Sequence, residues 1–140
     1  MFKHSKRHIL KTITWRFVAT TDTILISWFL TSDWTTGLKI GTFEVITKMF
    51  LYYFHERIWI KSSIKNPNKR HIYKTVTWRS IGTLDTIFIS WFLTGELSVG
   101  LSIGAVELLS KTVLYYIHEK MWYSVNYGLQ LSNNKRNLNN

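Results

Sequence analysis

The chain of 140 residues contains no cysteine, which excludes a disulfide framework, a thiolate metal site and a cysteine nucleophile. It contains one proline, Pro67, and only eight acidic residues against 18 lysines and arginines. The net charge of +10 predicts an anionic partner, either phospholipid headgroups or nucleic acid. No small-residue cleavage site follows an apolar run near the basic N-terminus, so we expect no removable signal peptide.

The apolar segments of the chain also lack a long uncharged stretch, because no uncharged run within them exceeds ten residues. A membrane-spanning helix usually has about 18 or more apolar residues, and each charge at its centre costs about 2.5–3.5 kcal/mol. These numbers favour a soluble protein. The chain has no HExxH motif, no nucleophile–base pair and no phosphate-binding glycine loop. We therefore expect a protein that is not an enzyme and holds no cofactor or metal.

What the chain does contain is a duplication. Residues 7–59 match residues 70–122 without a gap, with 30 identities over the 53 aligned positions. Each copy has two long apolar segments joined by a short turn, which predicts an αα-hairpin. We expect an all-α fold with a first hairpin repeat at 1–60, a basic linker at 61–69, a second hairpin repeat at 70–123 and a disordered polar tail at 124–140.

The positive charges gather at one end of each predicted hairpin. Of the 18 lysines and arginines, 15 lie before residue 17, from 57 to 79, or after 116. If each hairpin crosses a membrane and returns, all three regions lie on the same side, as the positive-inside rule requires. Trp15 and Trp34 are 19 residues apart, which is about 28 Å of helix and close to the thickness of the hydrocarbon layer.

Small and polar residues form one narrow face on each predicted helix at about 100° per residue. In the first copy these faces consist of Thr12, Arg16, Thr20, Thr23, Ser27 and Thr31, and of Gly37, Gly41, Glu44, Lys48, Tyr52 and His55. The second copy repeats both faces. A narrow polar face on an apolar helix suits packing inside a membrane bundle. This pattern and the charge placement outweigh the soluble alternative. They predict a four-helix transmembrane bundle in the cytoplasmic (inner) membrane, with both termini cytoplasmic.

Six ionisable residues fall near the middle of the predicted spans: Asp22, Glu44, Lys48, Asp85, Glu107 and Lys111. Charges within spans are candidates for ion or proton paths. Glu44 and Lys48 are four residues apart with the acid first, the better orientation for a helical ion pair. The alternative is that each Glu–Lys pair only fixes helix register. Asp22 lies about 80–100° from the polar face of its helix, so it contacts either a neighbouring hairpin or the lipid interface.

A second set of residues falls at the basic ends of the predicted spans, where we expect contact with lipid headgroups. This set is Trp15, Arg16, Trp78, Arg79, His55 and His118. The two histidines each precede a glutamate, but neighbouring residues on a helix point in different directions. We therefore expect no metal site there.

The motif KTxTWRxxxTxDTxxISWFLT, followed by GxxIGxxExxxKxxLYYxHExxW, resembles a bacterial and archaeal family of two-helix integral membrane domains of unknown function. The resemblance covers both copies, Arg7 to Trp59 and Arg70 to Trp122. It implies a membrane domain without an established activity. Some relatives are linked to sulfate-activation enzymes, so it also implies a context in sulfur assimilation. Lys39 is replaced by serine in the second copy, so we expect it to have no shared role.

Three classes of function fit these patterns. A small ion- or proton-linked transporter or channel would use the six intramembrane charges. A non-catalytic membrane subunit or scaffold would hold a cytoplasmic partner at its basic face. A nucleic-acid-binding protein would interleave aromatic and basic residues, whereas the aromatic residues here lie in apolar helices, so we expect no nucleic acid. Four short helices enclose little interior volume. We therefore expect a homo-oligomer or a larger complex, in a bilayer with anionic headgroups.

Overall fold

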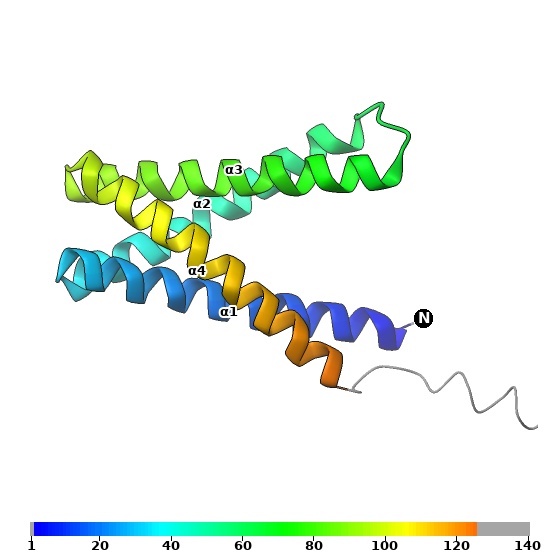
Figure 1. Cartoon of the computed structure of the whole chain (residues 1–140), viewed down its shortest axis with the longest axis horizontal. Coiled ribbons are helices and arrows are strands. Elements are labelled where there is room, and N and C mark those ends of the chain that lie inside the picture. Colours follow the sequence, from blue (N-terminus) through cyan, green and yellow to red (C-terminus); the bar gives the residue numbers. More distant parts are fainter. Residues whose placement is uncertain (1, 126–140) are drawn as a thin grey trace, which may run out of the picture.

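The structure is a computed structural model that describes residues 2–125, and this part of the chain forms four α-helices and no strand. The helices are α1 (Phe2–Thr31), α2 (Trp34–Ile60), α3 (Pro67–Thr94) and α4 (Leu97–Ser124). The predicted all-α fold of two helical hairpins is confirmed. Both hairpin turns lie at one end of the molecule, and the start of α1, the linker and the end of α4 lie at the other (Figure 1). The predicted tail falls almost entirely outside the described residues.

Each hairpin turn has its own local chemistry. Asp33 caps α2 by accepting hydrogen bonds from the backbone N–H of Thr35 at 3.1 Å and from the hydroxyl of Thr36 at 2.5 Å. The hydrogen bonds from Thr36 and Thr35 lower the pKa of the Asp33 carboxyl. In the second turn, Gly95 ends α3 with a φ of 76°, a left-handed conformation that glycine adopts without a steric penalty.

The linker between the hairpins is shorter than predicted, because α3 begins at Pro67 instead of after residue 69. Asn66 caps this helix, accepting hydrogen bonds from the backbone N–H groups of Asn68 at 3.0 Å and Lys69 at 3.2 Å. Proline suits the first helical position because its φ is preset and its missing N–H would have had no partner inside the helix. The single proline therefore starts a helix, where the sequence pattern suggested a connecting loop.

Within each hairpin the two helices approach closely at glycines. A Cβ atom built on Gly37 would lie 2.9 Å from the backbone oxygen of Ile24, and one on Gly100 would lie 2.8 Å from that of Ile87. Gly41 and Gly104, one turn later, also face these isoleucines. Both hairpins therefore pack through a pair of glycines four residues apart, a small-xxx-small contact.

The burial pattern is inverted relative to that of a water-soluble bundle. The buried hydrophobic residues in the described part of the chain are Ile40, Ile89 and Ile103. Large apolar side chains lie on the surface instead, with Phe29 84% and Phe92 76% exposed. The interior is mostly polar, and its buried polar residues are Thr23, Ser27, Glu44, His55, Thr86, Ser90, Glu107 and His118. Large apolar side chains exposed in this number mark a surface that contacts a partner or a membrane.

The helices contact one another in a closed ring, α1 with α2, α2 with α3, α3 with α4, and α4 with α1. The first helix of each repeat therefore packs against the second helix of the other repeat. In the view of Figure 1, α2 and α4 cross near the middle of the molecule. One described helix, α4, is long and apolar enough by itself to cross a membrane, with a mean hydropathy of 1.5. By comparison, α2 contains three charged residues within ten positions, namely Lys39, Glu44 and Lys48.

Candidate functional site: a buried cluster of glutamates and lysines

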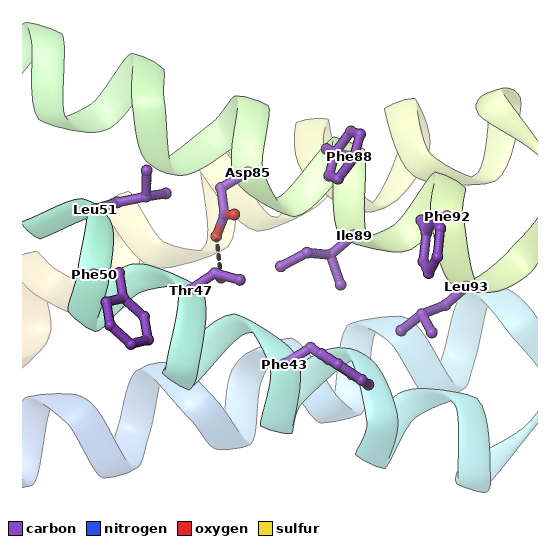
Figure 2. A pocket seen from close by; sticks show the side chains of 9 residues that line it. All are labelled: Phe43, Thr47, Phe50, Leu51, Asp85, Phe88, Ile89, Phe92 and Leu93. Carbon is purple, nitrogen blue, oxygen red and sulfur yellow. Dashed lines mark hydrogen bonds between the residues drawn. The ribbon is translucent and has the colours of Figure 1, made fainter.

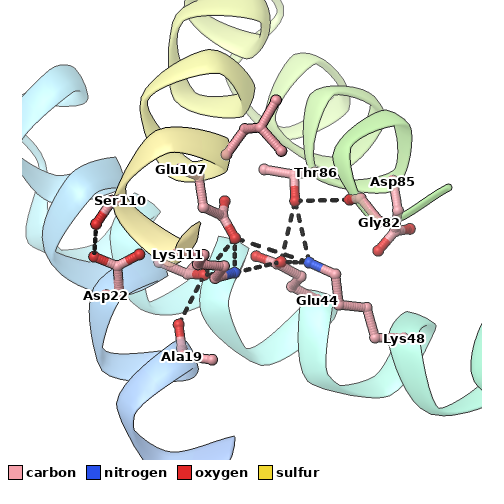
Figure 3. Close-up of polar contacts among 12 residues, drawn as sticks. Ala19, Asp22, Glu44, Lys48, Gly82, Asp85, Thr86, Glu107, Ser110 and Lys111 are labelled. Atoms are coloured by element: carbon pink, nitrogen blue, oxygen red, sulfur yellow. Dashed lines mark hydrogen bonds and ion pairs between the residues drawn. The ribbon is translucent and has the colours of Figure 1, made fainter. Parts of the chain in front are cut away.

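Four of the predicted intramembrane charges meet where α2 and α4 cross (Figure 3). Glu44 and Lys48 form an ion pair along α2, and Glu107 and Lys111 form the equivalent pair along α4. The Nζ atom of Lys111 also lies 3.2 Å from Oε1 of Glu44, and that of Lys48 lies 3.8 Å from Oε1 of Glu107. Because each lysine reaches both glutamates, these four side chains form one cluster, which we name the Glu–Lys tetrad.

A threonine from the first helix of each repeat completes the tetrad. The hydroxyl of Thr23 on α1 donates to Oε1 of Glu107 at 2.9 Å and accepts a hydrogen bond from Lys111 at 2.9 Å. Thr86 on α3 contacts Glu44 in the same way at 3.0 Å. All four described helices therefore contribute to the cluster. Its two negative and two positive charges cancel, and such pairing with added hydrogen bonds is what buried charges require.

The two aspartates contact the opposite hairpin. The hydroxyl of Ser110 on α4 donates to Oδ1 of Asp22 at 2.6 Å, and the hydroxyl of Thr47 on α2 donates to Oδ2 of Asp85 at 2.8 Å. For Asp22 the sequence left open a neighbouring hairpin or the lipid interface, and the structure shows contact with the hairpin. The six predicted charges are thus close together, but the aspartates lie beside the tetrad and make no ion pair in it.

The histidines lie between helices nearer the basic end. The indole N–H of Trp59 donates to Nε2 of His55 at 3.0 Å, and the hydroxyl of Thr77 lies 2.9 Å from the same nitrogen. In the second repeat, Trp122 donates to His118 at 3.1 Å. His55 is 4% exposed and His118 is 8% exposed. The structure buries both rings, and their predicted contact with headgroups stays a prediction.

The interface tryptophans also pack across the repeats. The ring of Trp15 on α1 meets Tyr115 on α4 edge to face at a centroid distance of 5.1 Å, and Trp78 on α3 meets Tyr52 on α2 at 5.4 Å. The guanidinium carbon of Arg79 lies 5.8 Å from the centre of the Tyr115 ring. These aromatic contacts join α1 to α4 and α2 to α3 in the part of the bundle between the tetrad and the basic end.

A small cleft of about 30 Å³ adjoins the tetrad and is lined by side chains of α1, α2 and α4. Its polar lining includes Arg16, Thr20, Glu44, Lys48 and Lys111. This volume is enough for a water molecule, and the lining offers the polar partners that an ordered water needs. In residues 2–125 no group of three or more histidine, aspartate or glutamate side chains is placed to hold a metal ion. The carboxylates, amines and hydroxyls of the cluster can exchange protons and hydrogen bonds with one another.

The contacts at the basic ends of the helices were not predicted from the sequence. Arg70 donates to the carbonyl oxygen of Trp59 at 2.7 Å, so it caps the end of α2, and Lys74 pairs with Glu56 at 2.5 Å. Arg7 and Lys11 make the same contacts with Trp122 and Glu119 on α4. The recurrence of these residues in both copies was a visible signal, but their partners belong to the other repeat.

These contacts between the repeats come in reciprocal pairs, as in an isologous dimer. The paired contacts are Thr23–Glu107 with Thr86–Glu44, Asp22–Ser110 with Asp85–Thr47, Trp15–Tyr115 with Trp78–Tyr52, and Lys11–Glu119 with Lys74–Glu56. The two halves of the chain therefore use the same residues to bind each other.

Comparison with known proteins supports this division. A model of the family described as "Predicted membrane protein (DUF2061)" matches the chain twice, at residues 9–60 and 72–123. The two matched segments coincide with the two hairpins, so the resemblance expected from the motifs, including its tandem repetition, is confirmed. The comparisons with curated proteins and with solved structures give no match.

Proposed function

Because the chain belongs to the DUF2061 family of predicted membrane proteins, we propose that each hairpin crosses the bilayer twice, with both termini on the basic side. The observation that carries this proposal is the inverted burial, in which phenylalanines cover the surface and glutamates lie inside. In lipid this arrangement places apolar side chains against acyl chains and polar ones against each other. The charges at the middle of α2 are compatible with a membrane span, because Glu44 and Lys48 are paired inside the bundle.

The absence of cysteine makes this topology directly testable. Ser63 in the linker and Ser98 in the first turn of α4 are both exposed and lie at opposite ends of the bundle. We expect a membrane-impermeant maleimide, applied to sealed inside-out vesicles, to label Ser63→Cys and not Ser98→Cys. Right-side-out vesicles should give the opposite result. The cysteine-free parent chain is the control, and labelling of both positions from the same side would contradict the four-span topology.

We propose further that the tetrad is an ion-handling element of a small proton-linked transporter or channel. Two features support this function. Each lysine lies within reach of both glutamates, so the ion pairs can exchange partners without exposing a charge. The adjoining cleft, which includes Arg16, has space for water next to Glu44. Intramembrane charges that contact a hydrated cleft are typical of ion and proton pathways.

Flux in proteoliposomes tests this function. We expect the unmodified chain to dissipate an imposed proton or cation gradient, and the double variant Glu44→Gln, Glu107→Gln to abolish the flux while it remains folded. The matched control is Glu56→Gln, which alters an ion pair between the repeats outside the tetrad and should retain flux. A folded, unmodified chain that carries no flux across a range of pH and of common ions, including sulfate, would overturn the transport proposal.

A second candidate is a non-catalytic membrane subunit that holds an anionic cytoplasmic partner. The observation that favours it is the exposed basic surface at the linker, formed by Lys61, Lys65 and Lys69. A partner protein, including one that acts in sulfur assimilation, should then co-purify in fixed stoichiometry and be lost when these three lysines are changed to glutamine. This outcome, together with no flux, would assign the tetrad to assembly.

A further inference from the structure

A pocket of about 430 Å³ lies between α2 and α3, on the outer side of the ring of helices (Figure 2). Four phenylalanines line it, together with aliphatic residues, and its polar residues are Asp85 and Thr47. The Thr47 hydroxyl donates to one carboxylate oxygen of Asp85, and the other oxygen points away from Thr47 (Figure 2). A pocket of this volume, with an apolar lining and a polar group at a fixed position, is typical of sites that bind small molecules.

The aromatic lining is specific to this side of the molecule. Three of the four phenylalanines have aliphatic residues at the equivalent positions of the other repeat, namely Val106 for Phe43, Val113 for Phe50 and Leu25 for Phe88. The equivalent aspartate also differs, because Oδ2 of Asp22 is buried with no hydrogen-bond partner. The two repeats share their internal contacts, so this difference on the outer surface is a departure from the duplication that packing between the repeats does not require.

We propose that this pocket binds a lipophilic organic cation, such as an ammonium or phosphonium ion that carries aromatic or alkyl groups. The faces of phenyl rings attract cations, most strongly where water is excluded, and the carboxylate of Asp85 supplies the opposite charge. Among the described residues Asp85 forms no ion pair, and Lys48, the neighbour of Thr47 on α2, is already paired with Glu44 and approaches Glu107. The carboxylate therefore remains available to a ligand.

The chemistry of the pocket distinguishes this occupant from two others. A metal ion would lose its water shell and gain few oxygen ligands among four phenyl rings. A lipid acyl chain would fill the apolar volume but leave the carboxylate beside hydrocarbon without a counter-charge. A cation with apolar substituents satisfies both the phenylalanines and the aspartate. The proposal does not depend on transport by the tetrad, because binding at this site is an equilibrium property of the outer surface.

Equilibrium binding of radiolabelled tetraphenylphosphonium to the full chain in nanodiscs tests the proposal. We expect saturable binding at one site per chain, weakened by about tenfold or more in Asp85→Asn, in which the ionic attraction is lost but the oxygen that accepts from Thr47 is kept. The matched control is Asp22→Asn, the same change at the equivalent position, which should bind as tightly as the unmodified chain. Helix content and thermal midpoint should be equal in both variants, so that a loss of binding reports on the site.

Two further measurements separate the cation from other occupants. The triple variant Phe43→Val, Phe50→Val, Phe88→Leu gives the pocket the lining of the other repeat, and we expect it also to lose about tenfold in affinity. Tetraphenylborate has the same shape and the opposite charge, and it should bind far more weakly than tetraphenylphosphonium. Equal binding of the two ions would assign the pocket to lipid tails and overturn the proposal. Equal loss in Asp22→Asn and Asp85→Asn, or no saturable binding, would also overturn it.

Discussion

Glu44→Ala is expected to lower the free energy of unfolding of the full chain by about 3–5 kcal/mol, the cost of removing one partner from a buried ion pair. The variant leaves Lys48 and Lys111 with a single carboxylate between them and removes one of the two acceptors of the Thr86 hydroxyl, the one at 3.0 Å. Because Glu44 is 3% exposed, water does not replace the carboxylate unless the helices separate. Denaturant titration in a fixed detergent, followed by tryptophan fluorescence, measures the change.

The matched control for this prediction is Glu56→Ala, which removes the partner of Lys74 at the partly exposed basic end. Ion pairs that water reaches contribute about 0–1 kcal/mol, so this variant should lose far less stability. Glu107→Ala should behave as Glu44→Ala does, because it occupies the equivalent position in the second repeat. Losses of equal size for Glu44→Ala and Glu56→Ala would show that the tetrad contributes no more than a surface ion pair.

The second large effect is expected at the glycines where the helices of each hairpin touch. Gly37→Ala and Gly100→Ala would each place a Cβ atom within 3 Å of a backbone oxygen on the preceding helix. Overpacking of this kind costs about 1–3 kcal/mol per site. Because the two sites lie in different hairpins, the double variant should lose about 2–6 kcal/mol. Thermal unfolding of the purified variants in the same detergent tests the expectation.

Gly82→Ala is the control for the glycine prediction. It is also a helical glycine, but its added Cβ would have Lys48 Cε at 3.7 Å as its nearest neighbour, an ordinary contact. We expect it to raise stability by about 0.4–1 kcal/mol, because alanine restricts the unfolded chain more than glycine does. A loss of stability in Gly82→Ala equal to that in Gly100→Ala would mean that close packing of the hairpin is not the cause.

The sequence predicted contacts within one helix well and contacts between helices poorly. The spacing of Glu44 and Lys48 was enough to predict their pair, because four residues bring two side chains to the same face of one helix. Helical periodicity identifies a face but not the helix that the face meets. For this reason the partners of Asp22 and Asp85, hydroxyl groups 88 and 38 residues away in the chain, could not be inferred.

Two other features were missed for different physical reasons. Pro67 suggested a break because proline lacks an N–H, but the first turn of a helix leaves that N–H without an intrahelical partner in any case. The pocket at Asp85 was missed because its phenylalanines lie on the apolar side of their helices, where a periodic pattern distinguishes only apolar from polar. The different size of Phe88 and its counterpart Leu25 was visible in the aligned copies, but its meaning depends on the neighbouring helix.

The reciprocity of the tetrad also bears on how the chain is made. Glu44 and Lys48 leave the ribosome 63 residues before their counterparts. At roughly 5–20 residues per second, the first hairpin waits about 3–13 s for the side chains that complete its interior. During that interval the charges of α2 already neutralise each other, since both partners lie on one helix. The arrival of α4 then adds second partners to charges that are already paired, so no lysine or glutamate of the tetrad waits unpaired for the other repeat.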